Sequence, residues 1–193
     1  MAVGQLAEVI AAPYTAWVAA PGTAFPTLAA EEGSFASGWT KLGTSGTKNY
    51  SEAGVTITHT QTQGQFVSAG GITPRKKWRT DEGMQVAFDL VDLSPKQYAL
   101  IMDSATVTTV TGAAGEQSFQ LKRGIKVHVY ALLLRGVSTL NEEKNGQYEI
   151  STCVQMANPA PKFALKGGPA MLSTQWDVLE LEEEKWAVFR QAS

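Results

Sequence analysis

The stretch Val55-Thr56-Ile57-Thr58-His59-Thr60-Gln61-Thr62 decides the fold class. Threonine takes every second position, and Val55 and Ile57 lie on the opposite side of the segment. A period of two built from β-branched residues is typical of a β-strand. The threonine face is polar yet favours strand geometry, so we expect it to be exposed or to contact another chain. Its members are Thr56, Thr58, Thr60 and Thr62.

A second strand follows this one along the chain. Residues 84–90 alternate between large apolar side chains and smaller or polar ones. The apolar positions are Met84, Val86, Phe88 and Leu90. Residues 63–74 hold three glycines and a proline and predict a loop or a long hairpin tip, while Asp81-Glu82-Gly83 is typical of a turn. We therefore expect a long loop over about residues 63–78.

One helix is predicted from agreeing signals at its first turn. Ser94 is suited to the N-cap, and Pro95 occupies N1, where its missing N–H does no harm. Gln97 at N3 would complete a capping box, and Leu93 and Tyr98 would form a hydrophobic staple. The helix should begin after Ser94 and end near Asp103.

Further short strands are expected on both sides of these elements. Asn145-Gly146 is a hairpin signal, and the flanking apolar runs have strand character. Residues 8–20 read as one or two short strands or an extended arm, and residues 21–38 as a connecting segment. The other expected strands are residues 38–43, 125–132, 147–154, and one or two strands over 171–181 and 185–189.

The sum predicts a mainly β chain, a β-sandwich or barrel-like sheet pair with one packed helix. No linker divides it, so we expect a single domain over residues 1–193 with an N-terminal arm over about residues 1–38.

Composition excludes several classes of protein. Sixteen basic and eighteen acidic residues give a formal charge of -2, without the basic excess of a dedicated nucleic-acid binder. The single cysteine, Cys153, lies among strand-forming residues and is expected to be buried rather than reactive. No apolar run is long enough to span a membrane, and the N-terminus lacks a signal-peptide pattern. Synthesis and retention in the cytoplasm are therefore expected.

Catalytic patterns are missing from the sequence. The two histidines, His59 and His128, fall in expected strands and have no ligand spacing. No serine sits in a nucleophile motif, and the glycines form no phosphate loop. We therefore predict no enzyme activity, no catalytic residue, no metal and no cofactor.

Basic and aromatic residues gather in the segments expected to be loops. Arg75-Lys76-Lys77-Trp78-Arg79 could bind nucleic acid, but pairing with acidic surfaces within the fold or across a subunit boundary is favoured. Large apolar side chains in loops need cover from the domain or a neighbour. These are Tyr14, Trp17, Phe25, Phe35, Trp39, Phe66 and Trp78.

Several blocks of the chain resemble one known family. The blocks are Trp17-Val18-Ala19-Ala20-Pro21-Gly22-Thr23-Ala24-Phe25-Pro26, Trp39-Thr40-Lys41-Leu42-Gly43, Gly54-Val55-Thr56-Ile57, and Arg79-Thr80-Asp81-Glu82-Gly83-Met84-Gln85-Val86-Ala87-Phe88-Asp89-Leu90-Val91-Asp92-Leu93-Ser94-Pro95-Lys96-Gln97-Tyr98. In these blocks the chain resembles the major tail tube protein of long-tailed bacteriophages and related gene transfer agents. The likeness is strongest over residues 17–102 and consists of strand and helix patterns.

The resemblance implies a structural virion protein of the phage tail, assembled in the bacterial cytoplasm. Such subunits form hexameric rings that stack into a hollow tube, and DNA passes through without being read. The implied partners are further copies of the chain, a tape measure protein inside the tube, a tail terminator and distal tail or baseplate proteins. The long loop and the terminal arms would reach the adjacent ring.

The candidate interface follows from this resemblance and from the loop residues. Its inter-subunit or inter-ring members are Trp17, Phe25, Gln65, Phe66, Val67, Ile72, Arg75, Lys76, Lys77, Trp78 and Arg79, and the four threonines are candidates for the lumen or a subunit contact. Two alternatives stay open: a tail terminator or completion protein that forms one ring, and a β-sandwich module that binds carbohydrate or another surface.

Overall fold

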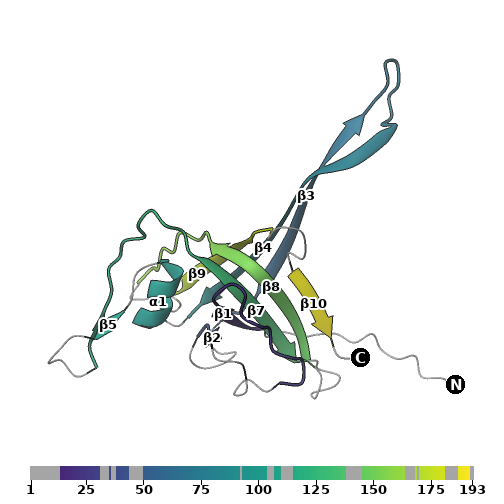
Figure 1. The fold of residues 1–193 in the computed structure, drawn as a ribbon. Helices are drawn as coiled ribbons and strands as arrows, with labels where there is room; N and C mark the ends of the chain where they lie inside the picture. Colours follow the sequence, from purple (N-terminus) through teal and green to yellow (C-terminus); the bar gives the residue numbers. More distant parts are fainter. Residues whose placement is uncertain are drawn as a thin grey trace.

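The structure is a computed structural model that describes residues 14–30, 35, 38–43, 50–91, 93–103, 107–109, 115–137, 145–163, 168, 170–180 and 187–191. Most described strands join one eight-stranded antiparallel sheet in the order β2-β1-β7-β8-β9-β4-β3, and β10 pairs with β8. The strands are β1 (Thr15–Ala19), β2 (Thr40–Lys41), β3 (Thr56–Phe66), β4 (Lys76–Leu90), β7 (Val129–Val137), β8 (Asn145–Gln155), β9 (Leu172–Val178) and β10 (Ala187–Gln191). A separate pair consists of β5 (Thr108–Thr109) and β6 (Gln117–Ser118). The mainly β fold with one helix is confirmed (Figure 1).

The core lies on one face of the main sheet and follows the alternation of the sequence. Met84, Val86, Phe88 and Leu90 of β4 are buried, and the residues between them are half-buried. On β9, Trp176 is fully buried and its ring meets Tyr130 edge to face. Burial of one such apolar side chain stabilises the fold by about 1.5 to 3 kcal/mol. The period of two in the sequence therefore predicts both the strand and which of its side chains face the core.

Tyr50 connects β4, near one end of the strand order, to β1, near the other end. Its backbone forms a bridge with Leu90 at the end of β4. Its hydroxyl accepts a hydrogen bond from the Ala16 N–H of β1 at 2.8 Å and donates one to the Leu42 carbonyl at 2.9 Å. The sheet consequently curls around its core, and the expected sandwich or barrel-like sheet pair takes the form of one curved sheet.

The helix α1 (Pro95–Ile101) begins as the capping signals predict. The Ser94 hydroxyl accepts the Gln97 N–H at 3.4 Å, and Pro95 stands at the first helical position. The reciprocal half of the capping box does not form, because the Gln97 side chain instead donates to the Lys41 carbonyl at 3.2 Å. The helix lies against β9, and its buried face includes Ala99 and Ile101.

Two sequence-based boundaries in the second half of the chain were wrong. The strand expected over 125–132 is β7, which begins at Val129, and the preceding residues 125–128 are exposed and outside any strand. Asn145-Gly146 is not a turn, because both residues belong to β8 and pair with Val137 and Gly136. The connection between β7 and β8 falls in residues 138–144, outside the described part, as do residues 1–13 of the expected arm.

The other expected strands are confirmed. Residues 38–43 contain β2, residues 8–20 contain β1, and the C-terminal region contains both β9 and β10. The described residues between β1 and β2 hold no strand or helix, as expected for a connecting segment.

The substitution Tyr50→Phe tests the closure of the sheet. It leaves a buried N–H at Ala16 and a buried carbonyl at Leu42 without the hydroxyl that serves both. We expect a loss of about 1 to 3 kcal/mol in the free energy of unfolding, measured by urea denaturation. Tyr98→Phe, on the partly buried helix face, is the matched control and should change little. An equal loss in both variants would contradict the closure role.

Candidate self-association surface

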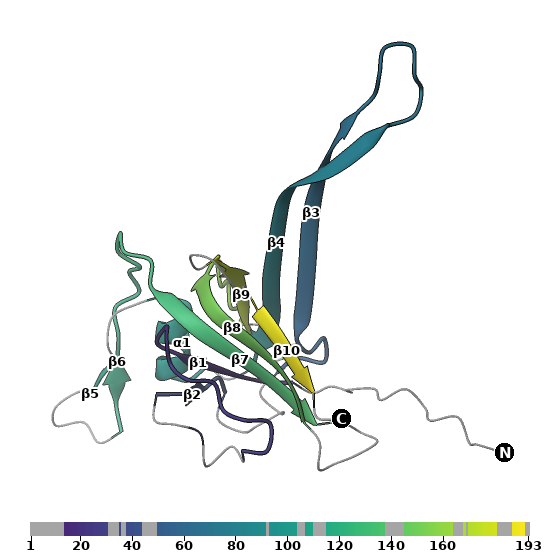
Figure 2. The same cartoon turned by 45° about the vertical axis from the view of Figure 1, so that its right-hand side comes forward.

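The most prominent feature outside the core is a long hairpin formed by β3 and β4. The half of β4 from Gln85 to Leu90 pairs with β9 as well as with β3. Beyond Gly83, the two strands pair only with each other and project from the body of the molecule (Figures 1 and 2). Every residue from 58 to 82 is exposed except Gly64 and Ser68, which are half-buried. We call residues 58–82 the projecting ribbon.

The ribbon corrects the expected loop over 63–78. Residues 63–66 and 76–78 are strand, and only residues 67–75 connect them. The connection is closed by the Arg75 N–H, which donates to the Phe66 carbonyl at 2.8 Å, and Gly70 adopts the φ of 77° that favours glycine. The turn expected at Asp81-Glu82-Gly83 was also wrong, because these residues pair with Thr62, Gln61 and Thr60.

The ribbon has two chemically different faces. The threonine face is exposed along its length, as the sequence predicts, and it continues to Gly64, over which the Trp78 ring lies. A Cβ at position 64 would meet the indole at 2.8 Å, so glycine lets the ring rest on the backbone. The opposite face carries Gln61, Arg79 and Glu82, joined by an Arg79–Glu82 ion pair of 2.7 Å and an Arg79–Gln61 hydrogen bond of 3.2 Å. A β-bulge at Thr80 keeps these residues on one side.

The outer end of the ribbon is basic and apolar. Residues 63–80 include four basic side chains and no acidic one. Arg79 pairs with Glu82, whereas Arg75, Lys76 and Lys77 make no ion pair within the described part of the chain. Ile72 is 99% exposed and Trp78 is 48% exposed. An isolated two-stranded ribbon is marginal in water, and exposed apolar groups mark interaction sites.

Two of the predicted interface residues lie elsewhere, inside the domain. Trp17 on β1 is buried, and its ring packs edge to face against Phe35 at 5.2 Å. Phe25 packs against Trp39 at 5.2 Å. The segment that follows β1 therefore lies along the sheet in the described residues, and Trp17 presents no surface to a neighbour in this conformation.

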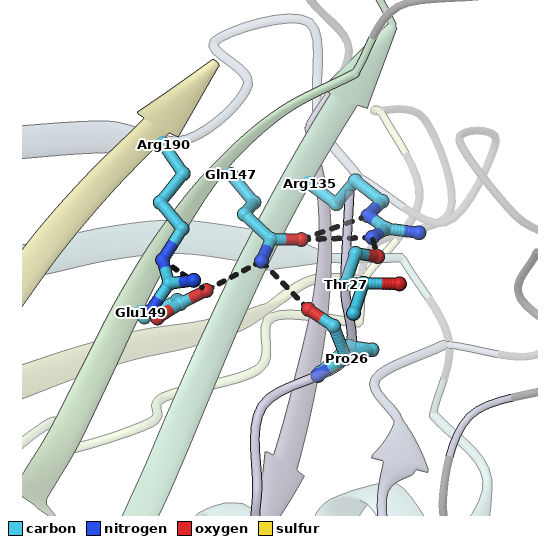
Figure 3. Close-up of polar contacts among 6 residues, drawn as sticks. All are labelled: Pro26, Thr27, Arg135, Gln147, Glu149 and Arg190. Atoms are coloured by element: carbon cyan, nitrogen blue, oxygen red, sulfur yellow. Dashed lines mark hydrogen bonds and ion pairs between the residues drawn. The ribbon is translucent and has the colours of Figure 1, made fainter. Parts of the chain in front are cut away.

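A polar network joins that segment to the sheet (Figure 3). Its Arg135 lies next to the core residue Leu134 on β7 and therefore on the opposite face of the sheet. The buried Arg135 guanidinium donates to the carbonyls of Thr27 and Ala30 and to the Gln147 side-chain oxygen. Gln147 donates to the Pro26 carbonyl at 2.9 Å and to the Glu149 carboxylate at 2.5 Å. The network therefore joins the segment to β7 and β8.

The same network fastens the C-terminal strand. The Glu149 carboxylate forms an ion pair of 3.1 Å with Arg190 on β10. On the other face of these two strands, the Phe189 and Tyr148 rings pack against each other with centroids 4.7 Å apart. In the described residues β10 pairs with β8 alone, and β3 pairs with β4 alone, so each strand leaves one edge open. Open edges are sites where another chain can add strands.

His128, one of the two histidines, belongs to a small polar cluster around the Asp103 carboxylate. Asp103, just after α1, has the positive φ of 51°, and its carboxylate accepts the Tyr130 hydroxyl at 3.0 Å and the His128 N–H at 3.0 Å. The His128 ring nitrogen Nδ1 lies 2.7 Å from the same carboxylate. Burial and the hydrogen bond from its own hydroxyl to Asp103 raise the pKa of Tyr130. His59 is exposed on the ribbon, and the described residues contain no cluster of potential metal ligands.

Comparison with models of known protein families and with curated proteins finds no match for this chain. In the described part of the chain, no helix has the length and apolar composition of a membrane span.

Cys153 is expected to be chemically inert in the folded chain. It is fully buried, its thiol donates to the Tyr130 carbonyl, and burial raises its pKa to about 12. Because the thiolate is the reactive form, native protein at pH 8 should react with an aromatic disulfide reagent at least about a hundredfold more slowly than denatured protein. The measurement is the absorbance of the released thiol over time. Equal rates before and after denaturation would contradict the buried placement.

Proposed function

We propose that this chain is a structural subunit that polymerises, the tube-forming subunit of a phage-like tail. The observation that carries the proposal is the projecting ribbon, which is exposed on both faces and yet ends in apolar and basic residues. Contact with a neighbouring copy would bury the exposed apolar groups of such a ribbon and stabilise its two strands. The resemblance of residues 17–102 to the tail tube family supports the same function.

Assembly would use two kinds of contact. The open edges of β3 and β10 would pair with strands of neighbouring copies around a hexameric ring, because ring closure removes exposed edges. The ribbon would reach the next ring and stack rings into a hollow tube. The threonine face would line the lumen or a subunit boundary, and DNA would pass without sequence-specific contacts. Tape measure, terminator and distal tail proteins would be its partners in the virion.

Deletion of residues 65–73 tests this function. The ribbon end makes no contribution to the core, so the shortened chain should keep the unfolding midpoint of the full chain and lose the ability to form tubes. The measurements are thermal unfolding by circular dichroism and negative-stain electron microscopy over a range of protein concentrations. Full-length protein should give rings or tubes with a central channel.

The outcomes separate the alternatives. Full-length chains that form a single ring and never a tube would favour a terminator role. Full-length chains that stay monomeric at every concentration, with no change after the deletion, would overturn the proposal.

A further inference from the structure

A cavity lies at the opposite end of the hairpin from its exposed tip. Its volume is about 550 Å³, and it sits where the chain enters β3 and where β4 ends. Its lining combines apolar side chains with two carboxylates, and consists of Tyr50, Ser51, Glu52, Ala53, Asp89, Val91 and Met171. An adjoining cavity of about 360 Å³ shares Ala53 and Asp89. We call the first of these the base pocket.

Three polar side chains of the base pocket are without an ion pair or side-chain hydrogen bond in the described part of the chain. Among the described residues, the buried Ser51 hydroxyl has no hydrogen-bond partner. Glu52 is exposed and Asp89 is half-buried, and neither forms an ion pair within the described part of the chain. Polar groups buried without a partner are rare and call for an explanation. A basic, partly apolar ligand would satisfy this set.

The outer end of the ribbon, residues 67–77, which we call the ribbon tip, carries the basic and apolar groups that would complement the base pocket. Ile72 is exposed in the connection between the strands, and Lys76 and Lys77, at the start of β4, make no ion pair within the described part of the chain. Another exposed apolar and basic segment, residues 121–127, is less suitable as a receptor, because Lys122, Arg123 and Lys126 would repel the tip.

The geometry of the hairpin requires that tip and pocket belong to different copies. Lys76 and Leu90 are the two ends of β4, and a strand rises about 3.4 Å per residue, so the tip lies roughly 50 Å from the base pocket of its own chain. A contact between two different surfaces is heterologous, and repetition of it generates a ring or an open stack. Because the two surfaces lie at the two ends of one hairpin, the repeat runs along that hairpin.

We propose that the base pocket is the receptor for the ribbon tip of a second copy of this chain, with Glu52 and Asp89 facing its lysines and Ile72 entering the apolar part. The inference rests on the proposed function and specifies its stacking contact. It gives the stack a repeat on the order of 50 Å, set by the length of β4.

Disulfide trapping tests the contact directly. Ala53 lines the pocket and Ile72 marks the tip, and the native Cys153 is buried. The full-length variant A53C/I72C should give a ladder of covalent multimers under mild oxidation, since each copy offers both ends. Mixed A53C and I72C single variants should give a dimer, whereas A53C alone should not. The control I125C/I72C, which places the cysteine on the basic segment, should give no ladder.

Charge reversal with rescue provides a second readout. Glu52→Lys should raise the protein concentration needed for stacking about tenfold or more, and the pair Lys76→Glu with Lys77→Glu should do the same. Because the lysine introduced at position 52 then faces glutamates, the combined triple variant should recover part of the lost stacking, with Asp89, which stays acidic, limiting the recovery. Lys122→Glu with Lys126→Glu, an equal charge change elsewhere, should have no effect. Sedimentation velocity and electron microscopy supply the measurements.

The results distinguish this contact from the wider proposal. Tubes that form normally in the E52K variant, together with no ladder from A53C/I72C, would overturn the pocket assignment and leave tube formation intact. A ladder equal to that of the I125C/I72C control would also overturn it, since it would report random collisions. A full-length chain that forms neither tubes nor a ladder would overturn both proposals.

Discussion

The pairing of β3 with β4 is the interaction on which the rest of the structure depends, because β4 serves two environments along one strand. From Met84 to Leu90 its alternate side chains fill the core, and β9 holds its other edge. From Gly83 outward it has no third strand and no core to face. The change comes at a glycine followed by a bulge at Thr80, where the loss of a side chain and an extra residue allow the ribbon to twist free of the sheet. One strand therefore supplies side chains to the core with its inner half and forms the projecting ribbon with its outer half.

Local chemistry was enough to predict much of this fold. The alternation around Val86 and the threonine repeat around Thr58 identified both strands of the hairpin, since side-chain direction repeats every two residues in any strand. The cap at Ser94 and Pro95 placed the start of the helix because capping satisfies backbone groups within one turn. The burial of Cys153 also followed from its strand-forming neighbours. Each of these features depends on residues that are close in the sequence.

The errors arose where distant residues decide the outcome. Asp81-Glu82-Gly83 has turn composition, but pairing with β3 keeps it extended, and tertiary context overrides propensity in strands. Gln97 could have closed the capping box, yet its side-chain amide donates to the Lys41 carbonyl, 56 positions away in the sequence. Trp17 was counted among the aromatic residues of loops, but it lies on β1 and is buried, with its ring packed against Phe35 of the segment that follows. The base pocket, likewise, joins Glu52, Asp89 and Met171, which no local pattern connects.

In the proposed assembly, the order of the projecting ribbon and the formation of contacts with neighbouring copies would be thermodynamically linked. Fixing a backbone residue opposes folding by about 1 to 2 kcal/mol, and the ribbon residues recover little of this through burial within their own chain. A partner that binds the ordered ribbon and not its frayed form shifts the equilibrium towards order by mass action. The first contact with a neighbour would then be weakened by the free energy needed to order the ribbon. A contact made to a ribbon that is already ordered would not be weakened in this way. In the proposed assembly, growth from an existing ring would therefore be favoured over the start of a new one, and at low concentration a chain would remain dispersed until a nucleus presents a surface that accepts its ribbon.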